Sequence, residues 1–316
     1  MDAELQDPRF TDEDAARQAL EAVVWPSGPI CPHCGNVDRA RIAKLATKSA
    51  RPGLYYCNEC EGQFTATVGT VFERSKIPLT KWWLAMHLLG SSKKGISSHQ
   101  LHRMLGISYK STWFMTHRIR EAMRAGGLAP MGGEGSIVEI DETFIGRKEG
   151  VEKARAGYGH KNAVLSLVER AGSVRSFRVD STKREDIIPI IKANIAKETH
   201  VMTDESNTYS KLGDDFAKHD MVDHGREEWG YTDRKTGVKI NTNTIEGYYS
   251  IFKRGMKGVY QHCSEKHLHR YVAEFDFRYS NRSKLGVEDV ERTSKIAAGI
   301  TGKRLTYRRA GEAAQA

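Results

Sequence analysis

Four cysteines arranged as two Cys-x-x-Cys pairs constrain the fold of residues 28–75 more than any other feature of the chain. The pairs are Cys31 with Cys34 and Cys57 with Cys60. Each pair is short enough for a tight turn, and four thiolates at this spacing suit one tetrahedral zinc ion. A structural zinc site has no open coordination position, so we expect a zinc ribbon that serves recognition, with any chemistry elsewhere. A disulfide pair is the alternative, but nothing in the chain indicates an oxidising compartment.

The size and charge of the chain narrow the class of protein. Its 316 residues predict two or three domains and a sizeable core. No apolar run is long enough for a membrane span, and the acidic first residues do not resemble a signal peptide, so we expect a cytoplasmic protein. The formal net charge of +9 favours a polyanionic partner such as DNA.

Helices are predicted on both sides of the ribbon. Residues 1–27 are expected to form an N-terminal helical cap, with a helix over 15–24 that ends at Trp25-Pro26. Residues 76–130 are expected to form a helical domain. Its first helix, over 79–92, carries Trp82 and Trp83, which we interpret as core residues because tryptophan is usually buried.

Two short helices over 97–125 are separated by Gly106-Ile107-Ser108 and resemble a helix-turn-helix. The second helix is basic, and we expect its basic side chains to face outward toward a DNA groove. A solvated basic face without DNA contact is the alternative interpretation. The predicted DNA-binding residues are Lys110, His117, Arg118, Arg120 and Arg124.

Residues 131–285 carry strand patterns. A glycine-rich linker at 132–135 precedes predicted strands over 136–145, 162–169, 174–179 and 199–203, with an amphipathic helix over 183–196 before the last of these. This order predicts an α/β domain of the RNase H-like class, a mixed sheet flanked by helices. Residues 286–316 are expected to form a basic, flexible tail.

Three acidic residues fall on separate elements of this domain. Asp141 emerges from the middle of the first strand and Asp204 ends the fourth, so the two carboxylates would meet if these strands are neighbours. Glu246 lies on a predicted helix, and Lys253 follows seven residues later on the same face. Three oxygen donors suit a pair of Mg²⁺ ions, and Lys253 could hold a substrate phosphate. Taken singly, each acid could instead be a cap, a turn residue or an ion-pair partner.

Several stretches resemble bacterial insertion-sequence transposases, most closely the fifteen-ninety-five (ISXO-like) family. That family joins an N-terminal zinc ribbon to an acid-triad (DDE-type) nuclease domain, and the resemblance covers roughly residues 10–285. It implies that Asp141, Asp204 and Glu246 bind two Mg²⁺ or Mn²⁺ ions beside Lys253, with Asn243 as an alternative third ligand. The stretches are Val138-Glu139-Ile140-Asp141-Glu142-Thr143, Met202-Thr203-Asp204, Asn243-Thr244-Ile245-Glu246-Gly247 and Ser264-Glu265-Lys266-His267-Leu268-His269-Arg270-Tyr271.

The resemblance implies a DNA transposase of an insertion sequence. Such an enzyme binds the terminal inverted repeats of its element and catalyses metal-dependent phosphodiester cleavage and strand transfer into target DNA. The expected cofactors are one structural Zn²⁺ and two active-site Mg²⁺ or Mn²⁺ ions. A homodimer or higher oligomer on DNA is expected, because two element ends must be brought together.

Two functions from other classes remain open on the sequence alone. One is a zinc-ribbon DNA-binding regulator whose nuclease domain is inactive, which metal-dependent nicking of end-containing DNA would exclude. The other is an RNase H-like structure-specific nuclease, which would cut branched DNA without joining ends.

Overall fold

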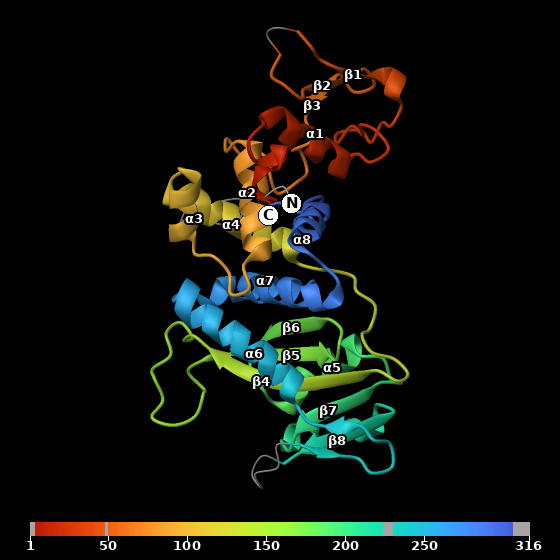
Figure 1. The fold of residues 1–316 in the computed structure, drawn as a ribbon, viewed down its shortest axis with the longest axis vertical. Coiled ribbons are helices and arrows are strands. Elements are labelled where there is room, and N and C mark those ends of the chain that lie inside the picture. The colour runs from red at the N-terminus through yellow and green to blue at the C-terminus, as the bar shows by residue number, and fades with distance from the viewer. Residues whose placement is uncertain (1–3, 48–49, 224–229, 306–316) are drawn as a thin grey trace. The chain divides into compact units, whose positions relative to one another are not determined.

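The computed structural model describes residues 4–47, 50–223 and 230–305. The chain forms two compact units (Figure 1). Within the described residues, unit one comprises 4–92, 96–124 and 289–305, and unit two comprises 93–95 and 125–288. Unit one thus combines the predicted cap, ribbon and helical regions.

Unit one is built on five helices. They are α1 (Glu13–Val24), α2 (Leu79–Ser91), α3 (Ser98–Leu105), α4 (Tyr109–Met123) and α8 (Asp289–Ala298). Trp82 and Trp83 of α2 are each 1% exposed, which confirms them as core residues. The Trp83 indole N–H donates to the carbonyl of Ala16 in α1 at 2.9 Å. The Glu13 carboxylate accepts from the first two amides of α2, so α1 also caps α2.

The ribbon of unit one is a three-stranded antiparallel sheet of β1 (Ile42–Lys44), β2 (Tyr55–Cys57) and β3 (Gly62–Phe64). Its few apolar side chains make a small aromatic core. Trp25 meets the rings of Tyr55 and Phe64 edge-on at 5.1 and 5.6 Å between centroids. A core this small rarely stabilises a fold without a disulfide or a bound metal, which is consistent with a metal at the cysteines.

The C-terminal region is a correction to the predicted flexible tail of residues 286–316. Residues 289–298 form α8, which packs against α2 and α4 and buries Ile296 and Ala297. The expectation of flexibility is therefore wrong for this segment, because its apolar residues complete the core of unit one. Residues 306–316 of the predicted tail lie outside the described residues.

Unit two contains a five-stranded mixed sheet, in the order β6-β5-β4-β7-β8. β4, β5 and β6 are antiparallel, whereas β7 and β8 run parallel to β4. The strands of Asp141 and Asp204 are neighbours, which is the condition under which their two carboxylates are expected to meet. The strands are β4 (Ile137–Ile145), β5 (Asn162–Glu169), β6 (Val174–Val179), β7 (His200–Asp204) and β8 (Lys218–Val222), and a separate two-stranded ribbon consists of β9 (Tyr231–Thr232) and β10 (Lys239–Ile240).

Helices cover both faces of this sheet (Figure 1). On one face, α5 (Arg184–Asn194) packs Ile187 and Ile191 against Val138 and Ile140 of β4. On the other, α6 (Asn243–Gly255) and α7 (Leu268–Ser280) pack against β4, β5 and β6. Since side chains alternate along a strand, Asp141 lies on the face that α6 covers and Glu142 on the opposite one. None of the helices in the described part of the chain has the length and apolar content needed to cross a bilayer.

Candidate active site and zinc centre

The four cysteines of the ribbon converge on one point. Their sulfur atoms all lie within 4.8 Å of one another, with Cys31 to Cys60 at 3.6 Å and Cys34 to Cys57 at 3.7 Å. Zinc–sulfur bonds near 2.3 Å in a tetrahedron place the sulfurs about 3.8 Å apart, so the cluster fits zinc. The Asn36 side-chain amide lies 3.6 Å from the Cys57 sulfur, where it would donate to the bound thiolate.

Asp141 and Asp204 occupy equivalent positions on adjacent parallel strands. Glu139 of β4 lies opposite Met202 of β7, and two more residues along each strand lead to Asp141 and Asp204. Neighbouring strands are about 4.8 Å apart, so both carboxylates leave the same side of the sheet at one level.

Negative charge is concentrated around this point. Burial, together with the charges of Glu142 and Asp204, raises the pKa of Asp141 to about 7. Burial and the charge of Asp204 likewise raise the pKa of Glu142 to about 7. Burial and the charges of these three acids raise the pKa of the Tyr209 hydroxyl well above its ordinary value. Incompletely compensated carboxylates of this kind fit a bound divalent cation.

Helix α6 brings a cation to this acidic region. The Tyr249 hydroxyl donates to the main-chain oxygen of Asp141 at 2.6 Å, which ties α6 to β4. The Lys253 ammonium lies 5.7 Å from the centre of the Tyr249 ring, and its charge lowers the pKa of Asp141. The structure therefore brings Asp141, Asp204 and Lys253 together, as the sequence predicts for their elements.

The third candidate ligands sit on the first turns of α6. Asn243 and Glu246 are both exposed, and a Glu246 carboxylate oxygen accepts from the Thr242 hydroxyl at 3.2 Å. Among the described residues, the only group of three or more potential metal ligands within 4.8 Å of one another is the cysteine cluster. Glu246 therefore does not close onto Asp141 and Asp204 in this conformation.

A cavity of about 580 Å³ lies between the C-terminal ends of β4 and α6, and Glu142 is the acidic residue that lines it. Three lysines line it, Lys161, Lys253 and Lys257, together with the stacked rings of Phe144 and Tyr158. The sequence reasoning missed Lys161 and Lys257, because they lie in segments without a motif. It also missed the contribution of Tyr209, although the acidic pair of β4 was a visible signal.

Three of the predicted DNA-binding residues of α4 are buried. The exposed fraction of His117 and of Arg120 is 0%, and Arg118 donates to the main-chain oxygens of Glu73 and Leu305. The predicted outward orientation of His117, Arg118 and Arg120 is therefore wrong. The physical reason is that α2, α3 and α8 pack around α4 and cover more than one of its sides. Lys110 and Arg124 are exposed, as expected.

The replacement Asp141→Asn is expected to stabilise the protein in the absence of added Mg²⁺. When the pKa of a carboxyl group is raised in the folded state, the free energy of unfolding of the protein falls as pH rises from about 4 to about 7. Above pH 7 the folded protein bears the full cost of the buried charge. At pH 8 we expect the free energy of unfolding to increase by about 1–3 kcal/mol. Denaturant unfolding should show this gain, and it should shrink as pH falls toward 5.

With added Mg²⁺, the wild-type protein should become more stable than Asp141→Asn, because Mg²⁺ stabilises the wild type by binding and has less effect on the variant. Asp180→Asn, at an exposed carboxylate of the same unit, is the matched control and should change neither result. A variant less stable than wild type at pH 8 would show that the charge of Asp141 is already balanced.

Comparison with known proteins agrees with this arrangement. Residues 132–280 match a family model described as an ISXO2-like transposase domain, and residues 11–63 match a transposase zinc-ribbon domain. Both models belong to the IS1595 family. The first match contains Asp141, Asp204, Glu246 and Lys253, and the second contains the four cysteines.

Two individual proteins are also similar. The chain is 26% identical over 295 residues to an uncharacterized protein in transposable element ISH50 of Halobacterium salinarum, a match that covers 88% of this chain and 95% of the relative. A cryo-electron microscopy structure of a simian T-cell lymphotropic virus intasome in complex with a protein phosphatase subunit aligns with a TM-score of 0.27 and 11% identity, over 56% of this chain and 63% of that one. This second likeness is too remote to indicate a shared fold. Because the zinc-ribbon match contains the four cysteines and the transposase-domain match contains the candidate acids, the chain belongs to the IS1595 family of insertion-sequence transposases.

Proposed function

We propose that this protein cleaves the ends of its insertion sequence and joins them to target DNA at a divalent-metal site on β4, β7 and α6. The observation that carries the proposal is the pairing of Asp141 and Asp204 at one level of adjacent strands, inside the matched transposase domain. The order and directions of the strands support the RNase H-like assignment of this domain.

Each side chain has a distinct task in this proposal. Asp141, Asp204 and a ligand from α6 would hold two Mg²⁺ ions, which when bound activate the attacking oxygen and stabilise the leaving one. The sheet holds the first two carboxylates in register. Lys253 would bind a non-bridging phosphate oxygen and offset the acidic charge that otherwise repels DNA.

The chemistry is two displacements at phosphorus. In cleavage, a water oxygen bonds to phosphorus, the bond to the DNA 3′-oxygen breaks, and the 3′-hydroxyl is released. In strand transfer, that hydroxyl attacks a target phosphodiester, so one phosphorus–oxygen bond forms as another breaks. One site serves both steps, because only the nucleophile changes.

We further propose that unit one recognises the element ends. Helices α3 and α4 are joined through Gly106 in the left-handed conformation, and Ser108 caps α4 through the amide of Ser111, as in a helix-turn-helix. Lys110 and Arg124 would contact phosphates, together with Arg103, which is exposed on α3. A homodimer or higher oligomer would hold two ends together.

Glu246→Gln is expected to eliminate cleavage, whereas Asn243→Ala should reduce it only partly. Both residues lie on the exposed first turns of α6, but a carboxylate binds Mg²⁺ far better than a neutral amide does. Asn243 would act through a hydrogen bond to a ligand or to DNA. Single-turnover cleavage rates at several Mg²⁺ concentrations measure the difference. The opposite ranking would assign the third ligand to Asn243.

The experiment that tests the proposed function is incubation of the purified protein with Mg²⁺ and DNA carrying the element's own ends. Cleavage that leaves 3′-hydroxyl ends, followed by their joining to a second DNA, is the expected result. Binding without cleavage would indicate the regulator. Cutting of branched DNA without any joining would indicate the structure-specific nuclease.

A further inference from the structure

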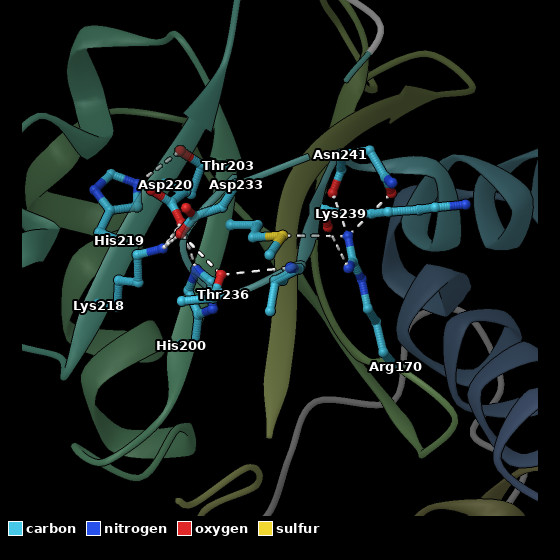
Figure 2. Close-up of polar contacts among 12 residues, drawn as sticks. Arg170, His200, Thr203, Lys218, His219, Asp220, Asp233, Thr236, Lys239 and Asn241 are labelled. Carbon is cyan, nitrogen blue, oxygen red and sulfur yellow. Dashed lines mark hydrogen bonds and ion pairs between the residues drawn. The ribbon is translucent and has the colours of Figure 1, made fainter. Parts of the chain in front are cut away.

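Arg170, which follows β5, makes hydrogen bonds to β4, to residues 239–241 and, at 3.2 Å, to the sulfur of Met202 on β7. Its Nε atom donates to the Glu139 carboxylate of β4 at 2.7 Å. Its Nη1 atom donates to the main-chain oxygen of Lys239 at 2.6 Å. Its Nη2 atom donates to the main-chain and side-chain oxygens of Asn241 at 2.8 and 3.0 Å. Figure 2 shows the Arg170 side chain extending to Lys239 and Asn241, just before α6 begins.

Glu139 links Arg170 to α6, because its carboxylate contacts both. Its side chain is 0% exposed, and the carboxylate oxygen that does not meet Arg170 accepts from the amide of Ile245 at 2.9 Å. The first amides of a helix have no partner within the helix, and a side chain at the N-cap usually serves them. The N-cap residue Thr242 makes no such bond here. A carboxylate from a neighbouring strand therefore caps α6. Its negative charge also interacts favourably with the positive end of the helix dipole.

Asn241 completes the connection. The side-chain oxygen that accepts from Arg170 also accepts from the amide of Asn243 at 3.2 Å. Arg170 thus holds both groups that cap α6, Asn241 directly and Glu139 through the ion pair. Because Glu139 and Asp141 are two residues apart on β4, their side chains share a face of the sheet.

We propose that Arg170 and Glu139 are a positioning pair that fixes the first turn of α6 against β4. In that position, the turn that carries Asn243 and Glu246 is fixed beside Glu139, two residues before Asp141 on β4. The inference rests on the proposed function and adds two residues to it. The competing role for Arg170 is a contact to a DNA phosphate. Most of its guanidinium N–H groups donate to acceptors inside the protein, which argues against that role.

The test replaces Arg170 with lysine and Glu139 with glutamine. Lysine keeps the charge but cannot bridge the carboxylate and two main-chain oxygens as the planar guanidinium does. Glutamine keeps the size of Glu139 but loses its charge. Arg278→Lys is the matched control, because Arg278 is likewise an arginine paired with a buried acid, Glu274, but on α7.

Two measurements need no DNA cleavage. Hydrogen exchange over residues 241–247 reports whether the amides of Asn243 and Ile245 remain protected. Electron paramagnetic resonance of added Mn²⁺ reports metal binding. In Arg170→Lys and Glu139→Gln we expect exchange to accelerate by about tenfold or more and Mn²⁺ binding to weaken by about tenfold, as is typical when a partner of a metal ligand is lost. Affinity for end DNA without metal should stay within about twofold, and Arg278→Lys should leave all three values unchanged.

Other outcomes overturn the inference. Unchanged exchange and unchanged Mn²⁺ binding in both variants would show that the pair does not position α6. Equal changes in Arg278→Lys would indicate a general loss of stability. Weaker DNA binding with unchanged Mn²⁺ binding would make Arg170 a phosphate contact. If the wild-type protein does not cleave end DNA, the proposed function fails, and exchange and Mn²⁺ binding still decide whether the pair positions α6.

Discussion

Replacing Asp141 with asparagine is expected to slow metal-dependent cleavage of the element ends by about a thousand-fold or more. The change removes an anionic oxygen donor from the pair that β4 and β7 hold in register, and a neutral amide is a poor ligand for Mg²⁺. Binding of the ends should stay within a few-fold of wild type, because we propose that unit one carries the surface that recognises them. Single-turnover cleavage at saturating DNA and binding without metal measure the two effects.

Asp204→Asn should behave like Asp141→Asn, since the two carboxylates occupy equivalent positions. Asp180→Asn is the control, because this exposed carboxylate of unit two is ion-paired with Arg178 and not with the site. Loss of folding or of end binding in Asp141→Asn would count against the metal-ligand assignment. Together with the expected gain in stability at pH 8, loss of cleavage would show that Asp141 is kept charged for function at a cost to folding.

Replacing Cys57 with serine is expected to release zinc and unfold the ribbon. Structural zinc contributes about 10–16 kcal/mol of binding free energy in small zinc modules, which the small aromatic core around Trp25 could not replace. We expect binding of the element ends to weaken by about tenfold or more. Metal content per chain, limited proteolysis and DNA binding measure these effects.

Cys31→Ser should have the same consequence, because both sulfurs belong to the cluster within 4.8 Å. Cys263→Ser is the matched control, since Cys263 lies in unit two and lines the cavity beside α6. It should retain zinc and the folded ribbon. Wild-type protein that contains no zinc after purification without chelators would remove the basis of the prediction.

Local patterns in the sequence were sufficient to predict the main elements of unit two. In the strands that carry Asp141 and Asp204, apolar residues such as Val138, Ile140 and Val201 alternate with polar ones, a pattern that predicts strands with a buried face. The strand β8 was missed because Lys218–Val222 is mostly polar. It joins the sheet at an edge beside β7, and contacts between side chains add to the backbone pairing. His200 of β7 lies 2.7 Å from Asp220 of β8, and Thr203 lies 2.9 Å from His219.

The helices of unit one show where pattern reasoning reaches its limit. The periodicity of α4 indicates one apolar face, so its basic residues were expected to be exposed. Helices from distant parts of the chain, α2 and α8, cover a further side and bury His117, Arg118 and Arg120. Arg118 is accommodated there because main-chain oxygens of Glu73 and Leu305 accept its hydrogen bonds and because its guanidinium lies over the ring of Phe114.

The sequence by itself determined the zinc ribbon, the buried strands and the candidate acids, because cysteine spacing and hydrophobic periodicity are local properties. Only the tertiary structure decided which charged residues are buried and which elements they connect. Glu139 and Arg170 lie 31 residues apart, and no motif links them, yet they form an ion pair whose carboxylate caps α6. A buried charge needs a partner, and the partner is chosen by the packing of strands and helices that are distant in the chain.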